Sequence, residues 1–97
     1  MPKFIRMAKL TEQGVKNIKN LKQMVAEVQA IMKSHEITLE AAYATMGQYD
    51  IIAVVDAPDA ETALKVSALI AQQGNFRAET MVAIPLRDFI GQVETAT

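Results

Sequence analysis

Residues 51–55 read Ile-Ile-Ala-Val-Val, an apolar run with a turn before it and a helix start after it. Five consecutive apolar residues predict a strand that is covered on both faces. Before the run, Gly47-Gln48 suits a two-residue type II′ hairpin that leads back to a strand over 37–46. After the run, Asp59 is placed to act as the N-cap of a helix.

The N-terminal segment predicts one strand and one helix. Residues 3–10 mix apolar and basic side chains and stop at Thr11, a favoured N-cap residue, so we expect a short strand there. Apolar residues then recur at three- and four-residue steps from Ile18 to Met32. This spacing predicts one long helix that ends near His35.

The C-terminal segment predicts a second helix and a last strand. The helix after Asp59 stops at Gly74, a residue type favoured just past a helix end. Alternating apolar residues predict a strand over 76–84, which Pro85 ends. We expect residues 85–97 to form a tail or a short helix that packs back on the body.

The resulting order, βαββαβ, predicts a single α+β domain over residues 1–97 with the ferredoxin-like fold. Right-handed crossovers place both helices on one face of a four-stranded antiparallel sheet and make the first and last strands neighbours. The other face should be polar if it meets water. Several strands instead carry apolar residues on both faces. This pattern predicts a second sheet, supplied by another copy of the chain in a dimeric α/β barrel.

Composition argues against several classes of protein. The 97 residues include ten Lys and Arg against eleven Asp and Glu, so we expect no binding to nucleic acid or membranes. With no cysteine and one histidine, the chain lacks a thiol nucleophile and the ligands of a typical zinc site. No apolar stretch suits a secretory signal or a membrane span. We therefore expect a cytoplasmic protein without a metal or another cofactor.

Residues 45–59, Thr-Met-Gly-Gln-Tyr-Asp followed by the apolar run and its helix start, resemble the GYD domain family. Thr11 with Gly14, and residues 74–80, match the family in the same order. The resemblance covers roughly residues 2–84 and implies the dimeric α/β-barrel superfamily without an assigned activity. The chain departs from the family pattern where Ser34-His35-Glu36 replaces a glycine pair.

A looser similarity links residues 47–56 and 77–84 to the effector-binding domains of leucine-responsive and asparagine-type regulators. That similarity implies a dimeric sandwich that binds amino acids between subunits.

Several positions allow both a structural and a functional interpretation. Tyr49 can pack over the sheet end and Asp50 can accept backbone N–H bonds, or both can line the mouth of a pocket. Arg6 lies on the first strand and Arg77 and Glu79 on the last, and because these strands are predicted to be neighbours, we expect Arg6 to lie close to Arg77 or Glu79. These charges can form an intersubunit ion pair or bind an anion, because lone buried charges are costly. The hydroxyl of Thr80 could reach the same space.

We find no Ser-His-acid arrangement, phosphate loop or dinucleotide-binding glycine motif, and we assign no catalytic residue. We expect a homodimer or higher oligomer that binds an amino acid or another small carboxylate near the subunit interface. The proposed ligand-binding residues are Tyr49, Asp50, Arg77, Thr80 and Arg6. One alternative is a cofactor-independent enzyme of the monooxygenase or isomerase type, with Tyr49 or Asp50 handling a proton. Another is a module that serves assembly alone.

Overall fold

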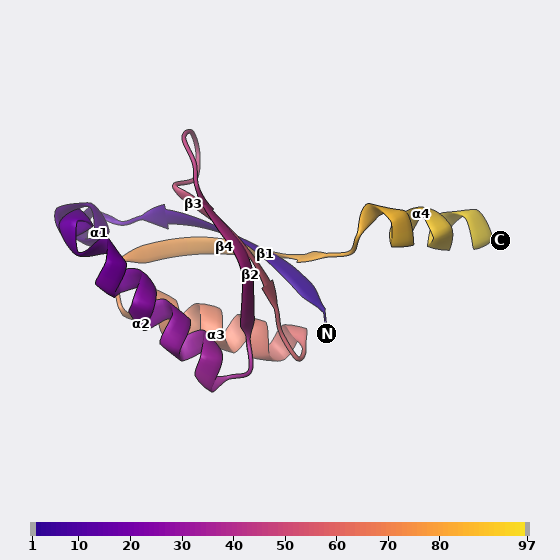
Figure 1. Cartoon of the computed structure of the whole chain (residues 1–97), viewed down its shortest axis with the longest axis horizontal. Helices are drawn as coiled ribbons and strands as arrows, with labels where there is room; N and C mark the ends of the chain where they lie inside the picture. Colours follow the sequence, from indigo (N-terminus) through magenta and orange to yellow (C-terminus); the bar gives the residue numbers. More distant parts are fainter. Residues whose placement is uncertain (1, 97) are drawn as a thin grey trace.

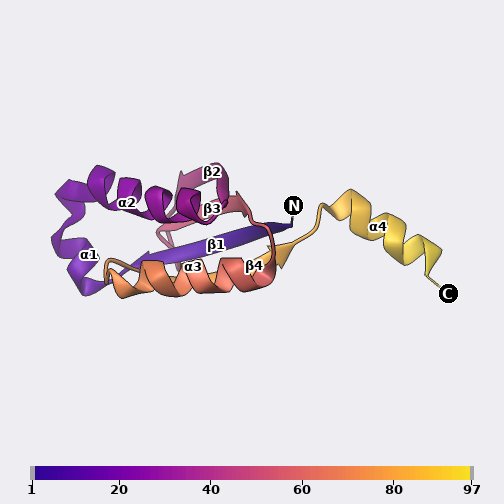
Figure 2. The same ribbon diagram turned by 90° about the horizontal axis from the view of Figure 1, so that it is seen from below.

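The computed structural model describes residues 2–96, which form a four-stranded antiparallel sheet with two long helices on one face (Figure 1, Figure 2). The elements are β1 (Lys3–Leu10), α1 (Glu12–Lys16), η1 (Ile18–Asn20), α2 (Leu21–Ser34), β2 (Thr38–Ala44), β3 (Ile51–Asp56), α3 (Ala60–Gln72), β4 (Phe76–Ala83) and α4 (Leu86–Thr95). The strand order is β2-β3-β1-β4, so the first and last strands are neighbours. The predicted ferredoxin-like α+β fold is confirmed.

The face of the sheet beneath α2 and α3 carries the hydrophobic core. Alternate residues of the central strands point to it, such as Phe4 in β1 and Val55 in β3, which pair across the sheet. The α3 helix adds Val66 and Ile70, the largest fully buried side chains. Asp59 caps this helix as predicted, because its carboxylate accepts the N–H of Thr62 at 2.7 Å. The chain's own helices therefore cover the centre of this face, while Val82 at the end of β4 stays exposed.

The long helix predicted from Thr11 to near His35 is interrupted, so that part of the prediction is wrong. Thr11 does cap α1, because its hydroxyl accepts the N–H of Gly14 at 3.0 Å. The N–H of Thr11 also donates to the carbonyl of Asn75, and a Cβ on Gly14 would lie 2.2 Å from that oxygen. These contacts fix α1 against the start of β4. The short 3-10 helix η1 then turns the chain so that α2 can run along the sheet (Figure 2).

The C-terminal end of α2 forms a Schellman motif around a residue that is not glycine. The N–H groups of Glu36 and Ile37 donate to the carbonyls of Lys33 and Met32, at 3.2 and 2.9 Å. Glu36 has a φ of 61°, a left-handed conformation that favours glycine. The chain therefore keeps this turn without the glycine pair that the family pattern places here.

The hairpin between β2 and β3 is wider than the predicted two-residue turn. The N–H of Thr45 donates to the carbonyl of Asp50 at 2.8 Å, and this bond encloses residues 46–49. Gly47 has a φ of 107°, which only glycine adopts readily, as the turn prediction required. The extra residues place Tyr49 beyond the sheet end rather than in a ladder position.

The short helix expected after Pro85 is present as α4, but it extends away from the body, so for residues 85–96 the expectation that this segment packs back is wrong (Figure 1). Residue 97 lies outside the described residues. Its large apolar side chains are about half exposed or more, and they follow the i, i+3, i+4, i+7 spacing of a single stripe. These residues are Leu86, Phe89, Ile90 and Val93. We call them the α4 stripe. Among residues 2–96, no helix is long and apolar enough to cross a membrane.

Candidate functional site

The face of the sheet opposite α2 and α3 is the candidate functional surface, and no helix of residues 2–96 packs over it (Figure 1, Figure 2). A bulge between Leu39 and Ala41 lets β2 contribute Ala41 and Tyr43 to this side. The apolar side chains at its centre come from all four strands and are Ile5, Met7, Ala41, Tyr43, Ile52, Val54 and Met81. We call this set the open face.

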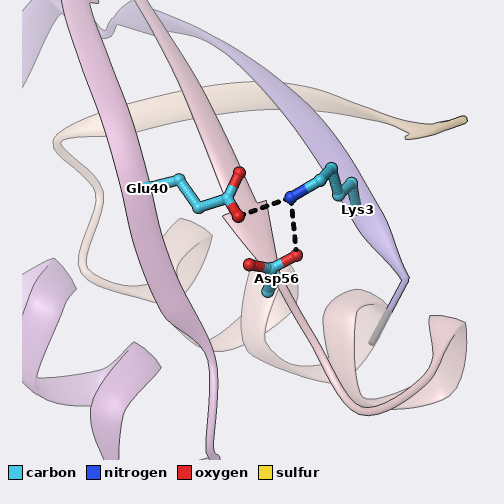
Figure 3. Close-up of polar contacts among 3 residues, drawn as sticks. All are labelled: Lys3, Glu40 and Asp56. Carbon is cyan, nitrogen blue, oxygen red and sulfur yellow. Dashed lines mark hydrogen bonds and ion pairs between the residues drawn. The ribbon is translucent and has the colours of Figure 1, made fainter. Parts of the chain in front are cut away.

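One end of the open face carries a cluster of three charged residues (Figure 3). The ammonium of Lys3 binds the carboxylate of Glu40 and lies 3.3 Å from that of Asp56. The hydrogen bond to Glu40 is the main cause that raises the pKa of Lys3, and Asp56 adds to it. Exposed ion pairs contribute little to stability. This cluster therefore contributes little to the stability of the fold. Its main consequence is the charge that it places at this edge of the open face.

The other end of the open face is a polar hollow of about 400 Å³. The hydroxyl of Tyr49 donates to the carboxylate of Glu79 at 2.8 Å, and the ammonium of Lys9 lies 5.9 Å from the centre of the Tyr49 ring. The bond to Glu79 raises the pKa of Tyr49, because a neighbouring carboxylate favours the protonated phenol. The lining residues are Met7, Lys9, Gln48, Tyr49, Arg77, Ala78 and Glu79.

The hollow brings together groups of both charges, which can bind a small zwitterion. Lys9 and Arg77 are paired across β1 and β4 and offer cationic donors. Glu79 offers a carboxylate two residues further along β4. Of the predicted ligand-binding residues, Tyr49 and Arg77 line this space. Sequence reasoning missed Lys9 and Gln48, because only the strand register and the wide hairpin bring them here.

Asp50 does not line the hollow but joins the hairpin to β1. Its carboxylate accepts the N–H of Leu10 at 2.8 Å, and its own N–H donates to the carbonyl of Ala8 at 2.8 Å. These bonds match the structural interpretation of Asp50, in which the carboxylate accepts backbone N–H groups.

Arg6 and Thr80 lie opposite each other in register, on the helix side of the sheet. The expected approach of Arg6 to Arg77 or Glu79 is wrong, because these residues point to the other side. Arg6 is only 7% exposed, and its guanidinium donates to the hydroxyl of Ser67 in α3 at 3.0 Å. Burial lowers the pKa of Arg6. The five predicted residues therefore fall into three separate places.

Residues 4–93 match the GYD domain, and the chain belongs to the GYD domain family. The glutamine synthetase and cystathionine beta-lyase binding protein of Thermus thermophilus is 32% identical over 95 residues. The alignment covers 97% of this chain and 100% of that relative. The resemblance noted from residues 45–59 is thereby confirmed.

Two solved structures share the fold with this chain. A protein from Thermus thermophilus superimposes with a TM-score of 0.61 and 21% identity, over 88% of this chain and 95% of that one. The leucine response regulatory protein of Mycobacterium tuberculosis gives a TM-score of 0.59 and 12% identity, over 87% of this chain and 51% of that one. The second fits the looser similarity to leucine-responsive regulators, at the level of fold.

Proposed function

We propose that this chain is a protein-binding domain that works as a homodimer and engages another protein through α4. The observation that carries the proposal is the apolar surface left uncovered in residues 2–96. It includes the open face and the α4 stripe, which lie on different parts of the chain. Large exposed apolar patches mark interaction sites in soluble proteins.

A second copy of the chain is the occupant that best suits the open face. Two sheets pack face to face through apolar inner sides, and a two-fold axis lets one surface complement itself. Each end of the open face carries both signs of charge, with Lys3 and Glu40 at one end and Arg77 and Glu79 at the other. Opposite charges can therefore meet across the two-fold axis whether each end of the open face lies against the same end or against the other end of its partner.

The α4 stripe then remains as an apolar surface that stands clear of the body (Figure 1). An isolated helix of ten residues is marginally stable in water, and it gains stability when its apolar side is buried. A groove on another protein can accept such a stripe at the i, i+3, i+4 and i+7 positions.

The relative from Thermus thermophilus supplies the first candidates for the partner, since its name states that it binds two enzymes. We propose that this chain binds a glutamine synthetase or a cystathionine beta-lyase of its own organism. Full-length coverage of that relative includes α4 as well as the sheet.

Binding to purified glutamine synthetase and cystathionine beta-lyase tests the partner directly, for example by biolayer interferometry. We expect at least one enzyme to bind the wild type, and the Ile90→Ser variant to bind at least tenfold more weakly. Leu64→Ser is the matched control, because Leu64 is an exposed leucine on α3 away from both surfaces. If neither enzyme binds the wild type, the proposed partners are wrong.

Sedimentation velocity tests the homodimer separately. Ile5 lies at the centre of the open face, between Val54 and Met81. We expect the wild type and Leu64→Glu to sediment as dimers and Ile5→Glu as a folded monomer, because two facing carboxylates would be buried without partners. A wild type that stays monomeric at high micromolar concentration would contradict the dimer.

A second candidate function is the binding of an amino acid or another small carboxylate in the polar hollow. The convergence of Lys9, Arg77 and Glu79 beside Tyr49 favours it. The Tyr49 hydroxyl donates its proton to Glu79, so its oxygen is available to accept a hydrogen bond from the ammonium of an amino acid. The catalytic alternative would use the same phenol as an acid.

Thermal-shift measurements with amino acids and organic acids test this second function. We expect a stabilising ligand to lose its effect in Arg77→Gln, while Arg87→Gln in α4 serves as the control. The absence of any stabilising ligand would leave the hollow as a charged rim of the dimer.

A further inference from the structure

The outer edge of β4 lacks the features that usually protect an edge strand. β4 lies at the end of the strand order, and all eight of its residues pair with β1 without a shift in register. Met81 and Val82, which point to opposite sides of the sheet, are 48% and 66% exposed. A regular, uncovered edge presents unpaired N–H and C=O groups, which can pair with another strand.

The other edge of the sheet, β2, does carry protective features. A bulge between Leu39 and Ala41 interrupts its regular pairing, and Glu40 within the bulge binds Lys3. Bulges and charged side chains are means by which natural sheets keep edge strands from pairing with other chains. The two edges therefore differ, and β4 is the edge suited to pairing.

The charges beside the β4 edge indicate what it pairs with. Lys9 and Arg77 lie directly opposite each other on β1 and β4, and among residues 2–96 neither forms an ion pair with a carboxylate. Like charges in opposite positions destabilise a sheet, so this pair favours an additional anion. Glu79 lies on the same side of β4, two residues from Arg77. A copy of β4 running in the opposite direction can therefore offer its carboxylate to Arg77.

We propose that β4 pairs in antiparallel fashion with β4 of a second copy of the chain, centred on Ala78. Residues opposite each other in such a pair point to the same side of the sheet, so the two-fold axis passes through a residue position. An axis at Arg77 or at Glu79 would place like charges opposite each other. An axis at Thr80 would place Glu79 opposite Met81. The axis at Ala78 instead places Arg77 of each copy opposite Glu79 of the other, which gives two ion pairs.

This surface lies along the edge of the sheet, so it does not depend on the open-face homodimer or on the protein partner proposed above. The pairing involves few residues, and small interfaces are weak. We therefore expect β4 to join copies of the chain only at concentrations above those at which the open-face dimer forms.

Cysteine cross-linking tests the pairing and its centre, because the chain has no cysteine of its own. The two copies of residue 78 would have Cα atoms about 4.5–5.5 Å apart, which suits a disulfide. Thr80→Cys is the matched control, since it lies on the same side of β4 and its two copies would be about 13 Å apart along the strands. Under mild oxidation at high protein concentration, Ala78→Cys should cross-link at least tenfold faster than Thr80→Cys.

Random collision would give the opposite order, because residue 80 is more exposed than residue 78. Cross-linking of Thr80→Cys that equals or exceeds that of Ala78→Cys would overturn the proposal. So would a folded Ala78→Cys protein that does not cross-link at all.

Exchange of the two charges tests the ion pairs in the same Ala78→Cys protein. Arg77→Glu and Glu79→Arg should each slow cross-linking at least tenfold, because each places like charges opposite one another twice. Both substitutions together should restore it, since the ion pairs return with their signs exchanged. A double variant that is no faster than the single variants would refute the register. Should Ala78→Cys fail to fold, sedimentation of the same charge variants of the Ile5→Glu protein at about 1 mM gives the same comparison.

Discussion

The two sides of the sheet are made of alternate residues of the same strands, but they differ in how they are covered. On the helix side, α2 and α3 bury Phe4 and Val55. On the open face, equally apolar residues such as Ile5 and Val54 are only partly buried, because no helix of residues 2–96 lies over them. The difference shows that this chain encodes more apolar surface than its own helices can bury. The surplus is the basis for proposing a second copy.

The largest expected effect comes from comparing two single substitutions in β3, each of which places a carboxylate on a different side of the sheet. Val55→Asp should unfold the protein or cost about 3–5 kcal/mol or more, because the carboxylate would be buried without a partner. Val54→Asp should cost the monomer about 1 kcal/mol or less and remove the dimer instead. Urea unfolding with sedimentation checks both. Equal destabilisation of the two variants as monomers would break the comparison.

The next effect concerns the contact that closes one end of the helix side. Gly14→Ala should destabilise the protein by about 1–3 kcal/mol, because the added Cβ would meet the Asn75 carbonyl at 2.2 Å. Gly91→Ala in α4 is the matched control, since nothing lies within 4 Å of its added Cβ. Thermal unfolding should show the control unchanged or slightly stabilised. A neutral Gly14→Ala would mean that α1 can move from β4 at little cost.

A smaller effect of opposite sign is expected at the end of α2. Glu36→Gly should stabilise the protein by about 0.5–1 kcal/mol, because glycine adopts the left-handed φ of 61° without a steric penalty. Urea unfolding measures the change. Glu27→Gly, within α2, is the control and should destabilise it by a similar amount. If Glu36→Gly does not stabilise the protein, the turn at residue 36 carries no strain.

The smallest expected effect is a change in the pKa of Tyr49, on the open side of the sheet. The chain has two tyrosines, so a Tyr43→Phe background leaves Tyr49 as the only phenol. Its ultraviolet absorbance should titrate above the ordinary pKa of about 10, and Glu79→Gln should lower that pKa. Because the folded-state pKa is raised, the stabilisation is complete below about pH 10 and is lost as the pH rises through the folded-state pKa. A pKa unchanged by Glu79→Gln would remove Glu79 as the cause.

Much of the fold could be predicted because its signals are local. The strand expected over 3–10 is β1, and Thr11 and Asp59 cap their helices as expected. The break near Asn17 could not be predicted from the periodic spacing, since it follows from the contact of Gly14 with Asn75, 61 positions away in the chain. The position of α4 could not be predicted either. An apolar stripe indicates that a helix side is to be buried, but not whether the same chain or another molecule buries it.

The sequence allowed individual candidate residues to be predicted, but not which of them lie together in one site. The sequence marked Arg6, Tyr49, Asp50, Arg77 and Thr80 as unusual. Strand register then placed Arg77 beside Lys9 in the hollow and Arg6 on the other side of the sheet, and the wide hairpin brought Tyr49 to the hollow. A shift of one residue in register moves a side chain to the opposite face of a sheet.

The sequence by itself determined the order of elements, the caps and the excess of apolar residues on the strands, because spacing and local hydrogen bonding decide these. Only the tertiary structure decided which side of the sheet each charge faces, where the chain turns between α1 and α2, and that α4 stands free. These depend on pairings between residues far apart in the chain, which no local pattern records.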